Sequence, residues 1–219
     1  MKLLKLLLLP YTALVIGAAF LWPAAAEGFI GESSRIIFFH VPCAIVGTEA
    51  FIVAGVFSLL YLRRPTARRD DIANASVRLG LLFAILTVIT GSIFSRIMWG
   101  AYWNWDPRQS SFLLLIFLYA AYLFLRAAIE DPEKKARLAA AYALFAVLPM
   151  LFLVFVAPRI TRSLHPQTFI NPEFKINADP RYLTVFLGSL VAFSGLYVWM
   201  LSLEARSLRL DRQSTARTH

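Results

Sequence analysis

Residues 77–129 read VRLGLLFAILTVITGSIFSRIM, then WGAYWNWDPR, then QSSFLLLIFLYAAYLFLRAAI. Two long apolar runs flank a short tryptophan-rich stretch. An α-helix needs about 20 apolar residues to cross the roughly 30 Å hydrocarbon core of a bilayer. Each run therefore predicts one membrane-spanning helix, and residues 99–108 predict a connection between them at one membrane surface.

The rest of the chain repeats this pattern. Hydrophobic residues make up 59% of the 219 and charged residues 16%, against roughly 25% charged residues in soluble domains. Long runs without the alternation of barrel strands are typical of helices. We therefore predict an all-α, six-helix transmembrane bundle forming one domain, residues 1–210, with a polar, disordered tail at residues 211–219. The six segments are Leu3 to Pro23, Ile36 to Leu62, Val77 to Met98, Pro107 to Ile129, Leu138 to Ala157 and Tyr182 to Leu203.

The first apolar segment has two interpretations. Lys2, Lys5, a leucine run and the alanines at 24–26 resemble a secretory signal peptide. However, its apolar stretch of about 20 residues exceeds the roughly 7–15 of a signal core. Trp22 and Pro23 are also typical of an anchor at the membrane interface. We expect this segment to be retained as a helix.

Basic residues predict the orientation of the helices. Fifteen of the 22 Lys and Arg residues fall on the side that holds both chain ends, and seven on the other. Since cytoplasmic loops carry the excess of Lys and Arg, both termini are predicted to be cytoplasmic. The net charge of +9 then reflects topology and does not indicate nucleic-acid binding. The predicted external loops are residues 24–35, 99–106 and 158–181.

The single cysteine, Cys43, lies inside an apolar run. One cysteine excludes an internal disulfide framework, a CxxC redox pair and the CxxCH motif of covalent haem attachment. The chain is therefore not itself a c-type cytochrome or a thiol oxidoreductase. We expect Cys43 to be a packing residue.

The stretch at residues 99–108 concentrates three of the five tryptophans, Trp99, Trp103 and Trp105, and adds Tyr102. One interpretation is an aromatic belt, because Trp and Tyr favour the membrane interface. A belt, however, is scattered over many helix ends. Rigid aromatic faces in one loop, with Gly100 allowing a tight turn, favour a platform for a large flat π-ligand.

Asp106 stands where the fourth helix should begin. Asp106, Pro107 and Gln109 fit the N-cap, N1 and N3 positions, with Gln109 closing a pair that resembles a capping box. We expect this structural role to be the main one for Asp106. Its place in the aromatic loop also keeps it among the candidate cofactor-binding residues.

Two of the three histidines lie on the predicted external face. His40, in the sequence FHVP, is near the outer end of the second segment, and His165, in SLHP, is in the third external loop. His219 ends the cytoplasmic tail and is treated as inert. Neutral imidazole is a common ligand of haem iron. Each could be an ordinary interfacial histidine, but their shared side and the lack of a histidine at mid-membrane depth favour a bis-histidine site.

Arginines of the same face could pair with the two propionates of a haem. Arg108 is the first choice, with Arg96 and Arg162 behind it. The alternative is that these side chains reach towards phospholipid headgroups.

The stretch WGAYWNWDPR, with FHVP at 39–42 and LHP at 164–166, resembles the motifs of the CcmC family, within the CcmC/CcmF/CcsA superfamily of haem-handling proteins. The likeness to CcmC covers essentially the whole chain. It implies non-covalent haem b with His40 and His165 as axial iron ligands. The further cofactor-binding residues that it implies are Trp99, Tyr102, Trp103, Trp105, Asp106 and Arg108. Tyr102 departs from the commonest CcmC pattern, which has tryptophan there, and is similar to CcsA-like loops.

The resemblance also implies a role in cytochrome c maturation in the bacterial inner membrane. Such a protein is not an enzyme. It presents haem on the periplasmic face to a haem chaperone like CcmE, together with ABC transporter subunits like CcmA and CcmB and a small subunit like CcmD.

Three alternatives stay open at this point. The chain could be a CcsA-like haem lyase component. It could be a membrane b-type cytochrome subunit carrying electrons, against which the lack of mid-membrane histidines argues. It could also transport haem across the bilayer, where Glu49 is the one acidic residue well inside a span that could line a path. Glu49 could equally pair with a group on a neighbouring helix.

Overall fold

The computed structural model describes residues 2–22, 31–165 and 179–215. The regular structure in these ranges is helical. η1 is a 3-10 helix and η2 a π-helix. The elements in chain order are α1 (Lys2–Leu21), η1 (Gly31–Ile36), α2 (Ile37–Arg63), α3 (Ala67–Trp99), α4 (Pro107–Ala128), α5 (Pro132–Leu151), η2 (Phe152–Val156), α6 (Ala157–Ile160) and α7 (Pro180–Thr215).

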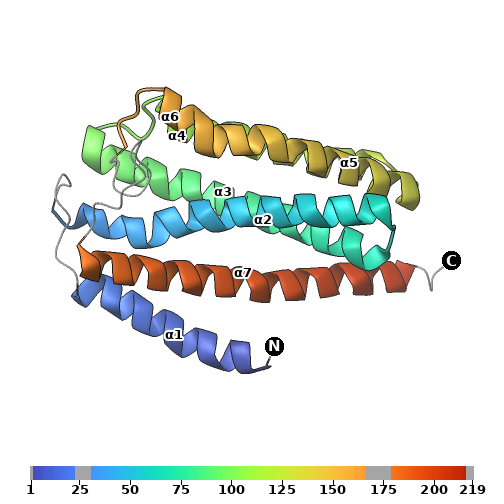
Figure 1. Ribbon diagram of the computed structural model, residues 1–219, viewed down its shortest axis with the longest axis horizontal. Helices are drawn as coiled ribbons and strands as arrows, with labels where there is room; N and C mark the ends of the chain where they lie inside the picture. Colours follow the sequence, from blue (N-terminus) through green and yellow to red (C-terminus); the bar gives the residue numbers. More distant parts are fainter. Residues whose placement is uncertain (1, 23–30, 166–178, 216–219) are drawn as a thin grey trace.

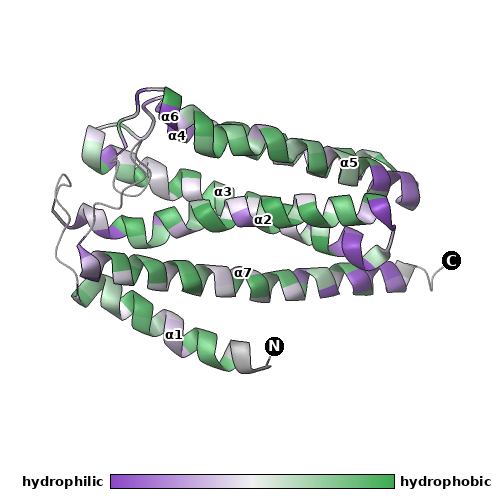
Figure 2. Ribbon diagram, in the orientation of Figure 1, coloured by the Kyte–Doolittle hydropathy of each residue, from purple (hydrophilic) through white to green (hydrophobic). Residues whose placement is uncertain are grey.

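Five segments of the described chain are long and apolar enough to cross a membrane, and their ribbons are apolar along most of their length (Figure 2). The all-α membrane fold predicted from the sequence is therefore confirmed. Within α1, the stretch Leu6–Leu21 is apolar but shorter than these five segments. The place of α1 as a sixth span therefore stays a prediction. The five segments are Glu32–Arg63, Ala67–Trp99, Pro107–Ala128, Pro132–Ile160 and Pro180–Ser214.

The long helices lie side by side along the long axis of the molecule (Figure 1). α2 is central and packs against α3, α5 and α7, whereas α4 packs on α3 and α5, and α1 lies at the edge on α7. We call one end of the bundle the loop end: it gathers η1, residues 99–106 and residues 161–165. The opposite end, the charged end, gathers the turns at 64–66 and 129–131 and the last part of α7.

Glycines let α2 approach its neighbours closely. A Cβ atom added at Gly80 of α3 would lie 2.6 Å from the Phe51 ring, and one added at Gly55 of α2 would lie 2.4 Å from Val147 of α5. Phe51 in turn stacks on Tyr119 of α4, with ring centroids 3.6 Å apart and planes 5° apart. Small residues at such crossings give membrane helices the van der Waals contact that drives their association.

Ion pairs join α3, α4 and α7 at the charged end. Arg126 of α4 donates two hydrogen bonds to Asp70 of α3, of 2.7 and 2.9 Å. Arg212 of α7 pairs with Asp71 and lies 3.5 Å from Asp70. Both aspartates are buried, so their charges depend on these partners.

Helices α3 and α5 begin earlier than we predicted. α3 begins at Ala67, not Val77, and α5 begins at Pro132, not Leu138. Hydropathy detects only the part of a helix that lies at bilayer depth, and both extensions are polar. The start of α5 follows from capping, because the side chain of Asp131 accepts from the Lys134 N–H.

The end of α7 also differs from the prediction. The helix continues to Thr215, so residues 211–215 are helical where we expected the disordered tail. The ion pair between Arg212 and Asp71 anchors this extension to α3, which a reading of local polarity could not detect. Residues 216–219 of the predicted tail lie outside the described residues.

Replacing Arg126 with glutamine should destabilise the bundle. The change leaves the buried Asp70 carboxylate without its main partner, which costs about 3–5 kcal/mol for a buried pair. The measurement is the midpoint of thermal unfolding in detergent, followed by circular dichroism. Arg137→Gln, at an exposed position of α5, is the control and should leave the midpoint nearly unchanged. Equal shifts for the two variants would contradict the role of this ion pair.

Candidate ligand-binding site at the loop end

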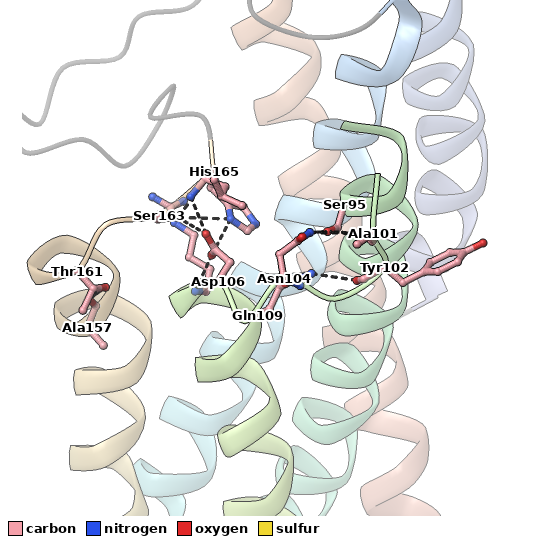
Figure 3. A network of polar contacts seen from close by, with 12 residues as sticks. Ser95, Ala101, Tyr102, Asn104, Asp106, Gln109, Ala157, Thr161, Ser163 and His165 are labelled. Atoms are coloured by element: carbon pink, nitrogen blue, oxygen red, sulfur yellow. Dashed lines mark hydrogen bonds and ion pairs between the residues drawn. The ribbon is translucent and has the colours of Figure 1, made fainter. Parts of the chain in front are cut away.

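Side-chain hydrogen bonds hold the loop at residues 99–106 in a tight turn. α3 ends at Gly100, whose φ of 79° forms a left-handed C-cap. Ser95 Oγ donates to the carbonyl of Ala101 (2.8 Å), and Asn104 Nδ2 donates to Ser95 Oγ (2.7 Å). These bonds satisfy polar groups of the loop and attach it to the last turns of α3 (Figure 3). The aromatic side chains are therefore carried on a fixed backbone.

Gln109, in the first turn of α4, completes this turn. Its Oε1 accepts from the Asn104 N–H (3.1 Å), and its Nε2 donates to the carbonyl of Tyr102 (3.3 Å). The predicted pairing of Gln109 with Asp106 is therefore wrong. The loop folds back over the start of α4, so that Asn104 and Tyr102 take the bonds of the amide (Figure 3).

Asp106 is the N-cap of α4, as predicted, and its Oδ1 accepts from the Arg108 N–H at 2.9 Å. The same buried carboxylate also binds the segment after α6. Oδ2 accepts from the Leu164 N–H (2.7 Å) and from Ser163 Oγ (2.9 Å), and Oδ1 lies 2.9 Å from His165 Nδ1. We call this group, Asp106 with residues 163–165, the Asp106 clasp (Figure 3). It joins two segments that are far apart in the sequence.

The clasp keeps the Asp106 carboxylate ionised and determines which nitrogen of His165 faces it. Burial alone would raise the pKa of Asp106, but the hydrogen bond and charge of His165 and the N–H groups of Leu164 and Arg108 lower that pKa well below its usual range. An ionised carboxylate only accepts hydrogen bonds. His165 Nδ1 therefore carries the hydrogen of their contact, and in the neutral imidazole Nε2 has the free lone pair.

His40 lies in the first turn of α2, and α3 orients its imidazole. Nδ1 is 2.9 Å from Thr90 Oγ1, and that hydroxyl donates to the carbonyl of Leu86 at 2.7 Å. Since a hydroxyl has one hydrogen, His40 Nδ1 is the donor and Nε2 again has the lone pair. Gly91 makes room for the ring, because a Cβ there would lie 2.8 Å from His40 Cε1.

Both histidines line one cavity of about 410 Å³ between α2, α3, α4 and η2. This volume falls within the roughly 300–1,000 Å³ of small-molecule sites. Trp103 and Arg108 also line it, and most of the remaining wall is apolar, as at Phe112. The structure thus brings together the two predicted iron ligands, one tryptophan of the loop and the first-choice arginine.

Trp99 supports the site without lining the cavity. Its ring centroid is 5.3 Å from that of His165 and 5.5 Å from that of Phe94, which does line the cavity. The indole is therefore packed between the imidazole and the cavity wall. This contact restricts the orientation of the His165 ring.

Tyr102 and Trp105 face away from the cavity. Tyr102 is exposed beside the Arg96 guanidinium, which lies 5.8 Å from the phenol centroid, and it points away from the Asp106 clasp (Figure 3). Trp105 is 76% exposed and meets Trp103 edge-on at 5.8 Å. Its φ of 54° is left-handed, a conformation that strains a bulky residue. The predicted platform thus has an inner face, at Trp103, and an outer face.

Arg96 and Arg162, the second choices for pairing with a propionate, lie away from the cavity. Arg96 donates to the carbonyl of Gly100 and so stabilises the end of α3. Arg162 is exposed in the segment after α6 and does not line the cavity. Of these three candidates, Arg108 is the one that the fold places at the cavity.

Sequence patterns did not indicate several residues that build the site. Thr90 and Gly91 sit inside an apolar run and carried no local signal. Asn104 and Ser163 belong to the aromatic and histidine motifs, but the sequence did not predict the hydrogen bonds that they make. Glu49 lines the cavity, and its carboxylate accepts a hydrogen bond from Ser194 Oγ of α7 at 3.1 Å. Glu49 therefore both faces an open space and pairs with a group on a neighbouring helix, the two roles that the sequence left open.

Asp106→Ala should cost more than the loss of a helix cap. An N-cap substitution costs about 1 kcal/mol, and each buried hydrogen bond lost adds about 1 kcal/mol. The backbone amide of Leu164 should exchange hydrogen faster, because it loses its acceptor. Asp131→Ala, which removes the exposed N-cap of α5, is the matched control and should show the cap effect alone. Unchanged exchange of the Leu164 amide in Asp106→Ala would rule out the clasp.

Comparison with known proteins gives a consistent picture. The profile of the family described as "Heme exporter protein C" (CcmC) matches residues 2–219. Heme exporter protein C of Rhodobacter capsulatus is 32% identical over 192 residues, 86% of this chain and 77% of the relative. Heme exporter protein C of Paracoccus denitrificans is 31% identical over 82% of this chain and 76% of the relative. The protein of the same name in Escherichia coli K12 is 32% identical over 63% of this chain and 57% of the relative. The tryptophan-rich loop, the two histidines and a match over almost the whole length agree: the chain belongs to the CcmC family.

Proposed function

We propose that the chain binds haem in the cavity at the loop end and passes it on during the biogenesis of c-type cytochromes. One observation carries this proposal: His40 and His165, from distant parts of the chain, line the same cavity. Their Nδ1 atoms are engaged by Thr90 and Asp106. Nε2 of each is therefore the nitrogen available to iron.

The surroundings of the two imidazoles fit this ligand. Histidines that bind metals commonly donate their other ring N–H to a carboxylate or another acceptor, which fixes the ring. Asp106 plays this part for His165, and Thr90 for His40. The apolar wall and Trp103 suit the face of a porphyrin, and Arg108 would pair with a propionate. Trp99 would hold His165 in place, while Tyr102 and Trp105 remain at the surface.

The role follows from the family. The relatives named above are heme exporter proteins, and a relative in Marchantia polymorpha is named as a putative cytochrome c biosynthesis protein. We expect this chain to present haem to a periplasmic chaperone like CcmE, within a complex that includes CcmA-, CcmB- and CcmD-like subunits. It would then act in delivery and not as an enzyme. The exposed rings of Tyr102 and Trp105 would meet the chaperone.

The proposed topology places the loop end outside. Six spans, with α1 as the first, and both termini in the cytoplasm would set the Asp106 clasp on the periplasmic face of the inner membrane. The charged end would then face the cytoplasm, which agrees with the excess of Lys and Arg there.

Replacing both His40 and His165 with alanine should abolish a low-spin haem spectrum in the purified protein. Two imidazoles leave no open position on the iron, and a low-spin spectrum follows from that coordination. The measurement is the optical spectrum after purification with co-expressed partners, and His219→Ala is the control. A wild-type spectrum in the double variant would overturn the ligand assignment.

Gly91→Ala tests the same site without removing a ligand. The added methyl group would meet His40 Cε1, and such overpacking costs about 1–3 kcal/mol. If the cost falls on haem binding, affinity drops by about tenfold to a hundredfold. Haem titration against absorbance measures it. Gly17→Ala in α1, where a Cβ meets nothing within 4 Å, should bind like the wild type. Equal affinities for both variants would contradict the role of Gly91 in positioning the His40 ring for haem.

A further inference from the structure

The cavity is bounded on one side by α2 and by η2, the segment that follows α5. α2 packs against α5. At Gly55 and Val147, α2 and α5 are so close that no side chain fits at the glycine. One turn along α2 towards the loop end, Ile52 already lines the cavity. From there to the loop end, residues of α2 line the cavity, and residues of η2 line it as well.

The chain changes from α5 to η2 along this part of the cavity. Pro149 lies inside α5, and the chain continues as a π-helix from Phe152. Proline removes a helical hydrogen bond, and π-helical turns interrupt the regular course of a helix. η2 packs on α4, and Phe155 of η2 lines the cavity together with residues of α2.

The rims of this gap are apolar and exposed. Ile52 of α2 is 40% exposed and Phe155 of η2 is 39% exposed, although both line the cavity. Both residues also belong to segments that are apolar enough to span a membrane. The cavity therefore reaches the flank of the bundle, where lipid would cover it.

The other approaches to the cavity are obstructed within the described residues. At the loop end, Trp103 and His165 line the cavity, and the Asp106 clasp fixes the segment that carries His165. Towards the charged end, the stacked rings of Phe51 and Tyr119 and the contact of Gly55 with Val147 fill the space between α2, α4 and α5.

We infer that the gap between α2 and η2 is a lateral portal, through which haem passes between the lipid and the two histidines. This inference rests on the proposed function for the identity of the ligand. A porphyrin with a large apolar face partitions into a bilayer, and it can enter through an apolar rim without exposing that face to water. Its two carboxylates would follow at the interface and meet Arg108, which lines the same cavity.

The test compares the rate of loading from lipid with that from water. The full-length protein is reconstituted in nanodiscs, and haem is supplied either dissolved in the nanodisc lipid or bound to albumin in the aqueous phase. The rise of the low-spin spectrum gives the rate of loading, and its final amplitude gives the amount bound. We expect lipid-supplied haem to load severalfold faster in the wild type.

Substitutions on the two rims make the test specific. Ile52→Trp should slow loading from lipid severalfold, because the larger side chain narrows the gap. Val56→Trp is the matched control: it lies one turn further along the same helix, is 50% exposed and does not line the cavity. Phe155→Ala widens the gap from the other rim and should speed loading.

The outcomes separate the portal from the proposed function. Loading that is equally fast from both sources, or rates that are the same in Ile52→Trp, Val56→Trp and the wild type, would overturn the portal while leaving haem binding intact. If Ile52→Trp does not fold, an unchanged rate in Phe155→Ala overturns the portal instead. No low-spin spectrum in the wild type from either source would overturn the proposed function and the portal with it.

Discussion

The site depends on one buried carboxylate. Asp106 starts α4, fixes the segment at residues 163–165 and sets the hydrogen on His165 Nδ1, all through four contacts of its two oxygens. A carboxylate in this place is stable only because N–H and O–H groups surround it. The position of the His165 imidazole therefore depends on the position of α4, and residues 163–165 are held in a defined geometry.

The helices could be predicted from the sequence because their cause is local. Runs of apolar residues at bilayer length leave the backbone no alternative to a helix. The predicted helix ends were wrong where helices continue beyond the apolar runs. Residues 67–76 and 211–215 are polar, and their helical state is stabilised by ion pairs such as Arg126 with Asp70 and Arg212 with Asp71. Those partners are distant in the sequence, so local hydropathy could not reveal them.

The site could be predicted only in part, for a similar reason. His40, His165, Trp103 and Arg108 were recognisable by residue type, and the fold gathers them around one cavity. What positions them was not recognisable. Thr90 and Gly91 determine the orientation of His40, yet both look like ordinary members of an apolar helix. The cluster of aromatic residues predicts a single surface, whereas the backbone of the loop turns Trp103 inward and leaves Tyr102 and Trp105 exposed.

The close contact of Gly55 with Val147 has a mechanical consequence. Fifteen residues of α2 separate Gly55 from His40, a lever arm of about 22 Å at 1.5 Å per residue. A tilt of about 10° between α2 and α5 around that fulcrum would displace the end that carries His40 by roughly 4 Å. The helices need not lose their contact for the far end to move by the width of an aromatic ring. A small change in the angle between α2 and α5 would therefore move His40 relative to η2, which lines the same cavity.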